Sequence, residues 1–131
     1  MLNHSLTITS WFNLVHTHNR GIAFGIFANS EKTVFIGLLL LAILTSAGLL
    51  AYLIIIQNKP KYLNLATSLA LGGAAGNIFD KITIYHVIDF IDIHWQQYHW
   101  PQFNLADSFI VLAALIYILN YKPAPKKITA R

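Results

Sequence analysis

The chain has 131 residues, of which 56% are hydrophobic and 11% are charged, with a net charge of +4. Soluble domains usually have about a quarter of their residues charged, so this composition favours a membrane protein with a single domain, residues 1–131. The absence of cysteine excludes disulfides and thiol catalysis, and the absence of a basic cluster interleaved with aromatic residues excludes an obvious nucleic-acid surface.

The N-terminal segment, residues 1–33, is predicted to lie at the outer surface of the membrane. Residues 5–17 (SLTITSWFNLVHT) are rich in β-branched and aromatic residues, which favours strands. Gly21 and Gly25 follow and are suited to a turn. This segment is too small to build a core alone, so we expect it to rest on the membrane.

Three stretches are predicted to span the membrane. Residues 34–56 contain no charged residue, which is enough apolar sequence to cross a hydrocarbon core of about 30 Å. Residues 62–79 are less apolar, because small and polar residues replace leucine, and residues 105–121 form the third span. The sequence therefore predicts a mainly α-helical membrane protein with a small interfacial β-structured segment.

Basic residues predict the orientation of these spans. Lys59 and Lys61 lie in the turn between the first two spans, and residues 122–131 form a basic tail. The positive-inside rule places this turn and this tail in the cytoplasm. Three spans then leave residues 1–33 outside, so we expect a further span to be encoded upstream of Met1. The acidic residues and the tryptophans all fall at the outer ends of the spans.

The outer segment, residues 80–104, contains an apolar run with two aspartates. Residues 84–95 (IYHVIDFIDIHW) alternate imperfectly, which is compatible with a strand or with an interfacial helix. We expect this segment to contribute to catalysis, because it places carboxylates against the membrane boundary.

Asp89, in this run, and Asp107, at the start of the third span, are the candidate catalytic pair. Two carboxylates held close together cannot both ionise easily, so one pKa rises and the pair shares a proton. One oxygen can then take a proton from water while the other donates to a carbonyl, as in aspartic proteases. Two alternatives remain open. Asp107 could be a helix N-terminal residue near an Asn104 cap, and Asp92 could replace Asp107 as partner by sharing a helical face with Asp89.

The stretch GGAAGNIFDK contains a second group of polar residues. Gly72 and Gly76 form a small-xxx-small pattern that lets another helix approach closely. Gly73, Asn77 and Lys81 are four residues apart and share one helical face, which directs an amide and an ammonium to the outer end. The alternative is ordinary helix packing with a lysine that extends to the interface.

The six histidines do not predict a metal site. No H-E-x-x-H helix is present, and His94 and His99 lie among interfacial aromatic residues. We expect neither a metal nor another cofactor.

Four motifs, in order along the chain, resemble those of the lipoprotein signal peptidase (signal peptidase II) family: FNLVHTHNRGIAFGIF, GGAAGNIFDK, HVIDFIDIH and WPQFNLADS. The resemblance implies four transmembrane helices, of which the first is missing here, and an interfacial β-structured cradle. It also implies an aspartyl endopeptidase of the bacterial inner membrane, active at the periplasmic face. Its substrates would be prolipoproteins, cleaved before a cysteine that carries diacylglycerol.

The resemblance also assigns residues to roles. It assigns catalysis to Asp89 and Asp107. The polar residues that it places around the substrate, or around a globomycin-type inhibitor, are Asn19, Asn77 and Asn104. Lys81 stands where the family usually has arginine, so a point charge replaces a bidentate donor at a predicted substrate-binding position.

Two other classes of protein remain open on the sequence. One is a small non-enzymatic membrane protein, such as a transporter subunit that uses Asp107 as a proton relay. The other is a structural fragment that needs a partner helix. Transport predicts polar or acidic residues deep within several spans. Residues 34–56 contain no charge, which disfavours the transporter interpretation. We expect contacts with membrane lipid, no nucleic acid and a monomer.

Overall fold

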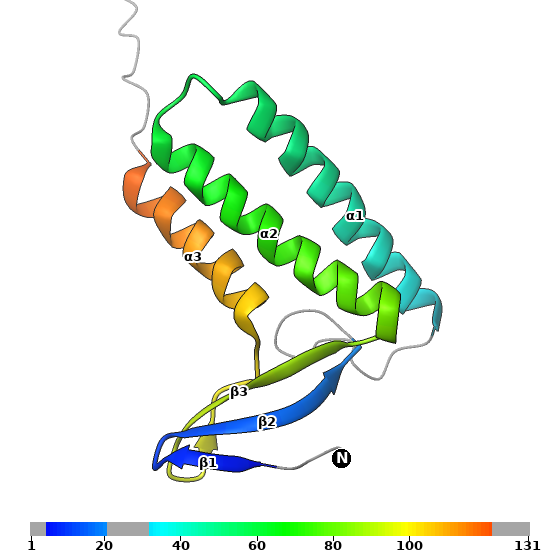
Figure 1. Ribbon diagram of the computed structural model, residues 1–131, viewed down its shortest axis with the longest axis vertical. Coiled ribbons are helices and arrows are strands. Elements are labelled where there is room, and N and C mark those ends of the chain that lie inside the picture. The colour runs from blue at the N-terminus through cyan, green and yellow to red at the C-terminus, as the bar shows by residue number, and fades with distance from the viewer. Residues whose placement is uncertain (1–4, 21–31, 122–131) are drawn as a thin grey trace, which may run out of the picture.

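A computed structural model describes residues 5–20 and 32–121 of the chain. The described residues form three helices, α1 (Lys32–Ile55), α2 (Lys61–Ile84) and α3 (Leu105–Asn120), together with a four-stranded sheet. The helices lie side by side with α2 in the middle, and the sheet lies at one end of them (Figure 1). The predicted turn at Gly21 and Gly25 and the basic tail lie outside the described residues.

The helix α1 is the most apolar element. Its most apolar 18-residue stretch has a mean hydropathy of 2.6, and none of its residues is buried by the rest of the protein. One side of α1 packs along α2, and the apolar side chains on its other faces stay exposed, which favours a lipid environment. Among the described helices, α1 alone is both long and apolar enough to cross a membrane, whereas α3 is apolar but has 16 residues.

The helix α2 extends beyond the predicted end at residue 79. No glycine or proline interrupts residues 80–84, so the helix continues to Ile84. It stops at Tyr85, which adopts the left-handed conformation with φ 61° and turns the chain toward the sheet. Pro60 precedes the other end, where its fixed φ is compatible with a helix start.

The sheet contains β1 (Leu6–Thr9), β2 (Phe12–Asn19), β3 (Val87–Trp95) and β4 (Tyr98–His99) in that order, and every pairing is antiparallel. The prediction of strands in residues 5–17 is confirmed. The choice left open for residues 84–95 is decided in favour of a strand, which begins at residue 87 because α2 occupies the preceding positions.

Buried side chains in the described residues are more often polar than apolar. The buried hydrophobic residues are Ile56, Ala66, Val87 and Ala113. The buried polar or charged residues are Asn13, Asn19, Thr67, Lys81, Asp89, Asp92 and Asn104. A domain that turns its large apolar side chains outward and its carboxylates inward is suited to lipid, and most of these buried polar residues gather where the sheet meets the helices.

The helices also separate the charges along their length. Lys59, in the turn between α1 and α2, and Lys61, the first residue of α2, lie at the end of the helices far from the sheet, and α3 ends there too (Figure 1). Asp89 and Asp107 lie at the opposite end, in β3 and at the start of α3. The predicted topology requires this separation of the lysines from the carboxylates. Which end faces the cytoplasm stays a prediction.

Candidate active site

A single hydrogen-bonded network connects Asp89 and Asp107 through side-chain amides. Asn104 donates from Nδ2 to Asp89 Oδ1 at 2.9 Å and to Asn77 Oδ1 at 3.2 Å. Asn77 in turn donates from Nδ2 to Asp107 Oδ1 at 2.8 Å. Asn19 donates to the other oxygen of Asp89, Oδ2, at 3.0 Å. Each member of this network is a predicted site residue, and they come from β2, β3, α2 and α3 and the residue that caps α3.

The start of α3 fixes two of these side chains. Asn104 is the N-cap residue, and its side chain accepts a hydrogen bond from the backbone N–H of Asp107 at 3.0 Å. Asp107 Oδ2 accepts from the backbone N–H of Asn104 at 3.3 Å, which completes a capping box. Asp107 is therefore an N-terminal helix residue, as the alternative interpretation held. It is also hydrogen-bonded to the amide network that leads to Asp89.

The end of β2 and the middle of β3 supply the other half of the network. Thr17 and Asn19 pair with Asp89 and Val87 across the two strands. This register places Asn19 diagonally opposite Asp89, within reach of its carboxylate. Asp89 is 3% exposed and Asn104 is 5% exposed, so these hydrogen bonds form away from bulk water.

Burial is the main reason why the pKa of Asp89 is raised above its ordinary value. The negative charge of Asp107 raises it further, whereas the hydrogen bonds from Asn19 and Asn104 and the positive charge of Lys81 lower it. A carboxyl whose pKa is raised by burial and by a second carboxylate is suited to hold a proton for catalysis.

Lys81 lies near the end of α2 that meets the sheet, and it is 6% exposed. Its ammonium interacts electrostatically with both Asp107 and Asp89. The alternative of a lysine that extends to the interface does not fit this burial, because the side chain of Lys81 is covered by protein. The prediction that Lys81 binds substrate stays a prediction.

Close packing between α2 and α3 brings Asn77 and Asp107 together. A Cβ atom placed on Gly73 would lie 2.4 Å from the backbone oxygen of Ala106, and one on Gly76 would lie 3.4 Å from Ala106 Cβ. Nothing lies within 4 Å of a Cβ on Gly72. Gly73 is therefore the glycine that the close approach requires, because a Cβ on Gly76 would make only an ordinary contact, whereas the sequence pattern had predicted Gly72 and Gly76.

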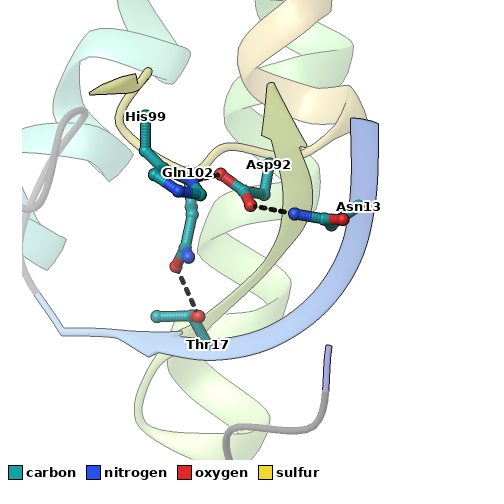
Figure 2. Close-up of polar contacts among 5 residues, drawn as sticks. All are labelled: Asn13, Thr17, Asp92, His99 and Gln102. Carbon is teal, nitrogen blue, oxygen red and sulfur yellow. Dashed lines mark hydrogen bonds and ion pairs between the residues drawn. The ribbon is translucent and has the colours of Figure 1, made fainter. Parts of the chain in front are cut away.

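Asp92 belongs to a separate polar cluster. The prediction that it could share a helical face with Asp89 is wrong, because the segment is a strand and residues three apart on a strand point to opposite faces. Asp92 accepts a hydrogen bond from Asn13 Nδ2 at 2.8 Å and lies 2.8 Å from Nδ1 of His99 (Figure 2). Sequence reasoning missed this cluster, because Asn13 is 79 residues from Asp92 and no local pattern connects them.

The histidines that the structure describes pack against one another. The rings of His18 and His86 are stacked with their centroids 3.6 Å apart, and those of His94 and His99 with theirs 4.9 Å apart. Within residues 5–20 and 32–121, no group of three or more histidine, cysteine or acidic side chains is arranged to hold a metal ion.

An apolar cavity of about 430 Å³ lies beside the network, along α3. Asp107 is the acidic residue in its lining. The other lining residues are Trp100, Phe103, Ser108, Ile110, Val111, Leu112 and Leu115. A carboxylate at the edge of an apolar cavity can act on a polar bond whose neighbouring groups are apolar.

Comparison with known proteins identifies the family. Residues 1–122 match the Peptidase_A8 family, described as signal peptidase (SPase) II. Lipoprotein signal peptidases from Aeromonas hydrophila and Tolumonas auensis are both 42% identical to the chain. The matches cover 92% and 94% of this chain and 72% and 77% of those proteins, respectively. The relative from Serratia marcescens is 41% identical over 86% of this chain and 65% of its own length.

A likeness in three dimensions agrees with this result. A solved structure described as a bacterial membrane enzyme, determined by the in meso method, has a TM-score of 0.71 with this fold. Its sequence is 26% identical, and the match covers 91% of this chain and 71% of that chain. The chain belongs to the signal peptidase II family of aspartic peptidases.

Proposed function

We propose that Asp89 and Asp107 are the water-activating pair of this signal peptidase II. The family gives the class of reaction, peptide hydrolysis by an aspartic peptidase that acts on prolipoproteins. The observation that supports the assignment of residues is the amide network that links the two carboxylates through Asn104 and Asn77. Membership in a peptidase family sets aside the interpretation of Asp107 as a transporter's proton relay.

The chemistry needs one carboxylate and one carboxylic acid. The ionised member takes a proton from water, whose oxygen attacks the carbonyl carbon, while the protonated member donates its proton to the carbonyl oxygen. The resulting tetrahedral intermediate collapses when a proton passes to the leaving amine. The raised pKa of Asp89 favours the retention of one proton by the pair. Amides that donate to the carboxylate oxygens would hold both groups in orientation during these transfers.

The substrate would be a prolipoprotein cleaved before a diacylglyceryl-modified cysteine. The apolar cavity along α3 supports this, because an acyl chain can lie against Phe103 and the aliphatic residues of the helix while the peptide bond reaches Asp107. Asn19, Asn77, Lys81 and Asn104 would contact the peptide, or a globomycin-type inhibitor in its place. In this proposal no metal or other cofactor takes part.

The proposed location is the bacterial inner membrane, with the active site at the periplasmic face. All three helices would span the membrane as a monomer, surrounded by lipid. The exposed apolar surface of α1 supports this, as does the separation of Lys59 and Lys61 from the carboxylates. Their turn, and the tail of residues 122–131, would then be cytoplasmic.

Asparagine substitutions test the catalytic pair. Asp89→Asn and Asp107→Asn preserve shape and remove the ionisable group, so each should abolish cleavage of a lipid-modified prolipoprotein and leave membrane insertion intact. Asp80→Asn is the matched control, because an amide oxygen can still accept the hydrogen bond that Asp80 receives from the backbone of Ile88 at 3.4 Å. Substantial cleavage by either of the first two variants would refute the aspartyl assignment.

A further inference from the structure

The cluster around Asp92 lies outside the proposed catalytic network. Asp92 and Asn13 are buried, whereas the side chain of His99 is 50% exposed. Asp92 is 2% exposed and forms its two hydrogen bonds with side chains of different strands, Asn13 on β2 and His99 on β4. Burial acts to raise the pKa of Asp92, but the hydrogen bonds from these two residues, together with the charges of His99 and His94, outweigh it, so the net effect is a lowered pKa. Asp92 is therefore held as a buried anion.

We propose that Asp92 is a positioning residue that holds residues 99–103 against β3 and thereby fixes Asn104 between the two catalytic carboxylates. This inference rests on the proposed function, because it assigns a role in the reaction of that same site. It names a residue that acts through His99 and Asn13 and that does not touch the substrate.

The segment that follows His99 is attached to the edge of β3 along its length. Trp100 donates from its backbone to Ile93 at 2.8 Å. Phe103 donates to Ile91 at 3.2 Å and accepts from the same residue at 2.9 Å. The side chain of Gln102 is hydrogen-bonded to that of Thr17 on β2, so the segment is held from both strands (Figure 2).

Asn104 is the next residue after this attached segment. Its side chain reaches Asp89 at 2.9 Å, and its backbone N–H reaches Asp107 at 3.3 Å. A shift of residues 99–103 along β3 would therefore move a donor of each catalytic carboxylate at once. His99, held by Asp92, is where this segment begins, and Asn104, at the active site, is where it ends.

A buried carboxylate is a costly way to fasten a hairpin, since well-packed apolar residues often stabilise a protein at least as well as a buried ion pair. What a carboxylate adds is a fixed hydrogen-bond geometry. It accepts only along fixed lines from Nδ1 of His99 and Nδ2 of Asn13, which sets the separation of β2, β3 and β4. The ring of His99 also stacks on His94, which limits its rotation.

Two substitutions of His99 distinguish the contribution of its hydrogen bond from that of its ring packing. His99→Asn places an amide nitrogen where Nδ1 stands and should retain most activity, whereas His99→Phe keeps a ring on His94 and removes the donor. Asp92→Ala removes the acceptor. For His99→Phe and Asp92→Ala we expect kcat for a lipid-modified prolipoprotein to fall about 10- to 100-fold, with KM little changed, because a small misplacement of reacting groups is expensive. Tyr98→Phe, on the same strand, is the matched control.

The pH profile gives a readout that simple loss of stability would not move. Asn104 lowers the pKa of Asp89, in competition with burial and Asp107, while Lys81 acts in the same direction as Asn104. Asp89 holds the proton of the pair, so its pKa sets the alkaline limb of kcat/KM, and a displaced Asn104 should move this limb to higher pH in His99→Phe and in Asp92→Ala. Hydrogen exchange of peptides that cover residues 99–104 should also become faster in these variants, which requires no activity.

Wild-type kcat, wild-type exchange and an unmoved alkaline limb in His99→Phe would overturn the inference. So would an equal loss of kcat in His99→Asn and His99→Phe, since the donor would then be irrelevant. If Asp92→Ala fails to fold, the two His99 variants and the exchange measurement still decide the question. Full activity of Asp89→Asn would instead refute the proposed catalytic pair, so the two failures are distinguishable.

Discussion

Replacing Gly73 by alanine tests how closely α2 and α3 must pack for the active site to work. The new Cβ would lie 2.4 Å from the backbone oxygen of Ala106 and 2.9 Å from Ile110 Cγ1, whereas ordinary contact begins at 3.4 Å. The difference, 3.4 minus 2.4, requires the helices to separate by about 1 Å, because a backbone oxygen cannot rotate away. Overpacking of this kind costs about 1–3 kcal/mol of stability.

The separation acts on the active site directly. Asn77 follows Gly73 by one helical turn, and Asp107 follows Ala106, so the 2.8 Å hydrogen bond from Asn77 to Asp107 spans the same contact. A separation of about 1 Å would lengthen this bond to about 3.8 Å, which is no longer a hydrogen bond. Misplacement on this scale lowers turnover by about 100-fold. We therefore expect Gly73→Ala to lower kcat by this factor.

The assay is cleavage of a lipid-modified prolipoprotein, with the apparent Tm of the same preparation in detergent. Gly72→Ala is the control, since a Cβ at that position meets nothing within 4 Å and alanine favours a helix over glycine. It should cleave at the wild-type rate with an unchanged or higher Tm. Equal turnover by folded Gly73→Ala and Gly72→Ala would refute the argument that this contact sets the geometry of the site.

Two further predictions concern charge. Lys81→Ala removes a positive charge that lowers the pKa of Asp89, the proton-holding member, so the alkaline limb of kcat/KM should move to higher pH, whereas Lys81→Arg should resemble the wild type. An unmoved alkaline limb in Lys81→Ala would contradict this. Because the pKa of Asp89 is raised, the folded protein binds this proton more tightly than the unfolded chain does. The stability that Asp89 contributes is therefore lost as the pH rises from the unfolded pKa of about 3.9 through the higher folded pKa. The apparent Tm of the wild type should therefore fall relative to that of Asp89→Asn as the pH rises from about 4 to about 7; a constant difference would show that the pKa is not raised.

The helices could be anticipated from the sequence because their signals are local. The absence of charge in residues 34–56 and the periodic small residues of α2 can each be recognised without tertiary information. The strand at Val87–Trp95 could not be separated from an interfacial helix, because a short apolar run with two aspartates fits either period. Its pairing with β2 decides the matter, and that pairing is made by residues about seventy positions away.

The residues of the candidate site were foreseen, but their connections were not. A pattern of glycines predicts a close helix contact without fixing the rotation of the helix, which is why Gly73 rather than Gly72 faces Ala106. In the same way, an asparagine before a helix predicts a cap. It does not predict that the amide of Asn104 also reaches Asp89, which depends on where β3 lies relative to α3.

The position of Asp107 in an apolar helix follows from two demands on the same carboxylate. One oxygen, Oδ2, accepts from the backbone of Asn104 and closes the capping box, while the other, Oδ1, accepts from Asn77. Because the cap fixes the rotation of the side chain, it also directs Oδ1 toward the amide network that leads to Asp89. A carboxylate placed elsewhere in α3 would lack both the backbone donor and the helix dipole that stabilise its charge beside lipid. Helix initiation and the proposed catalysis therefore require the same geometry, so a change that loosens the first turn of α3 should weaken both.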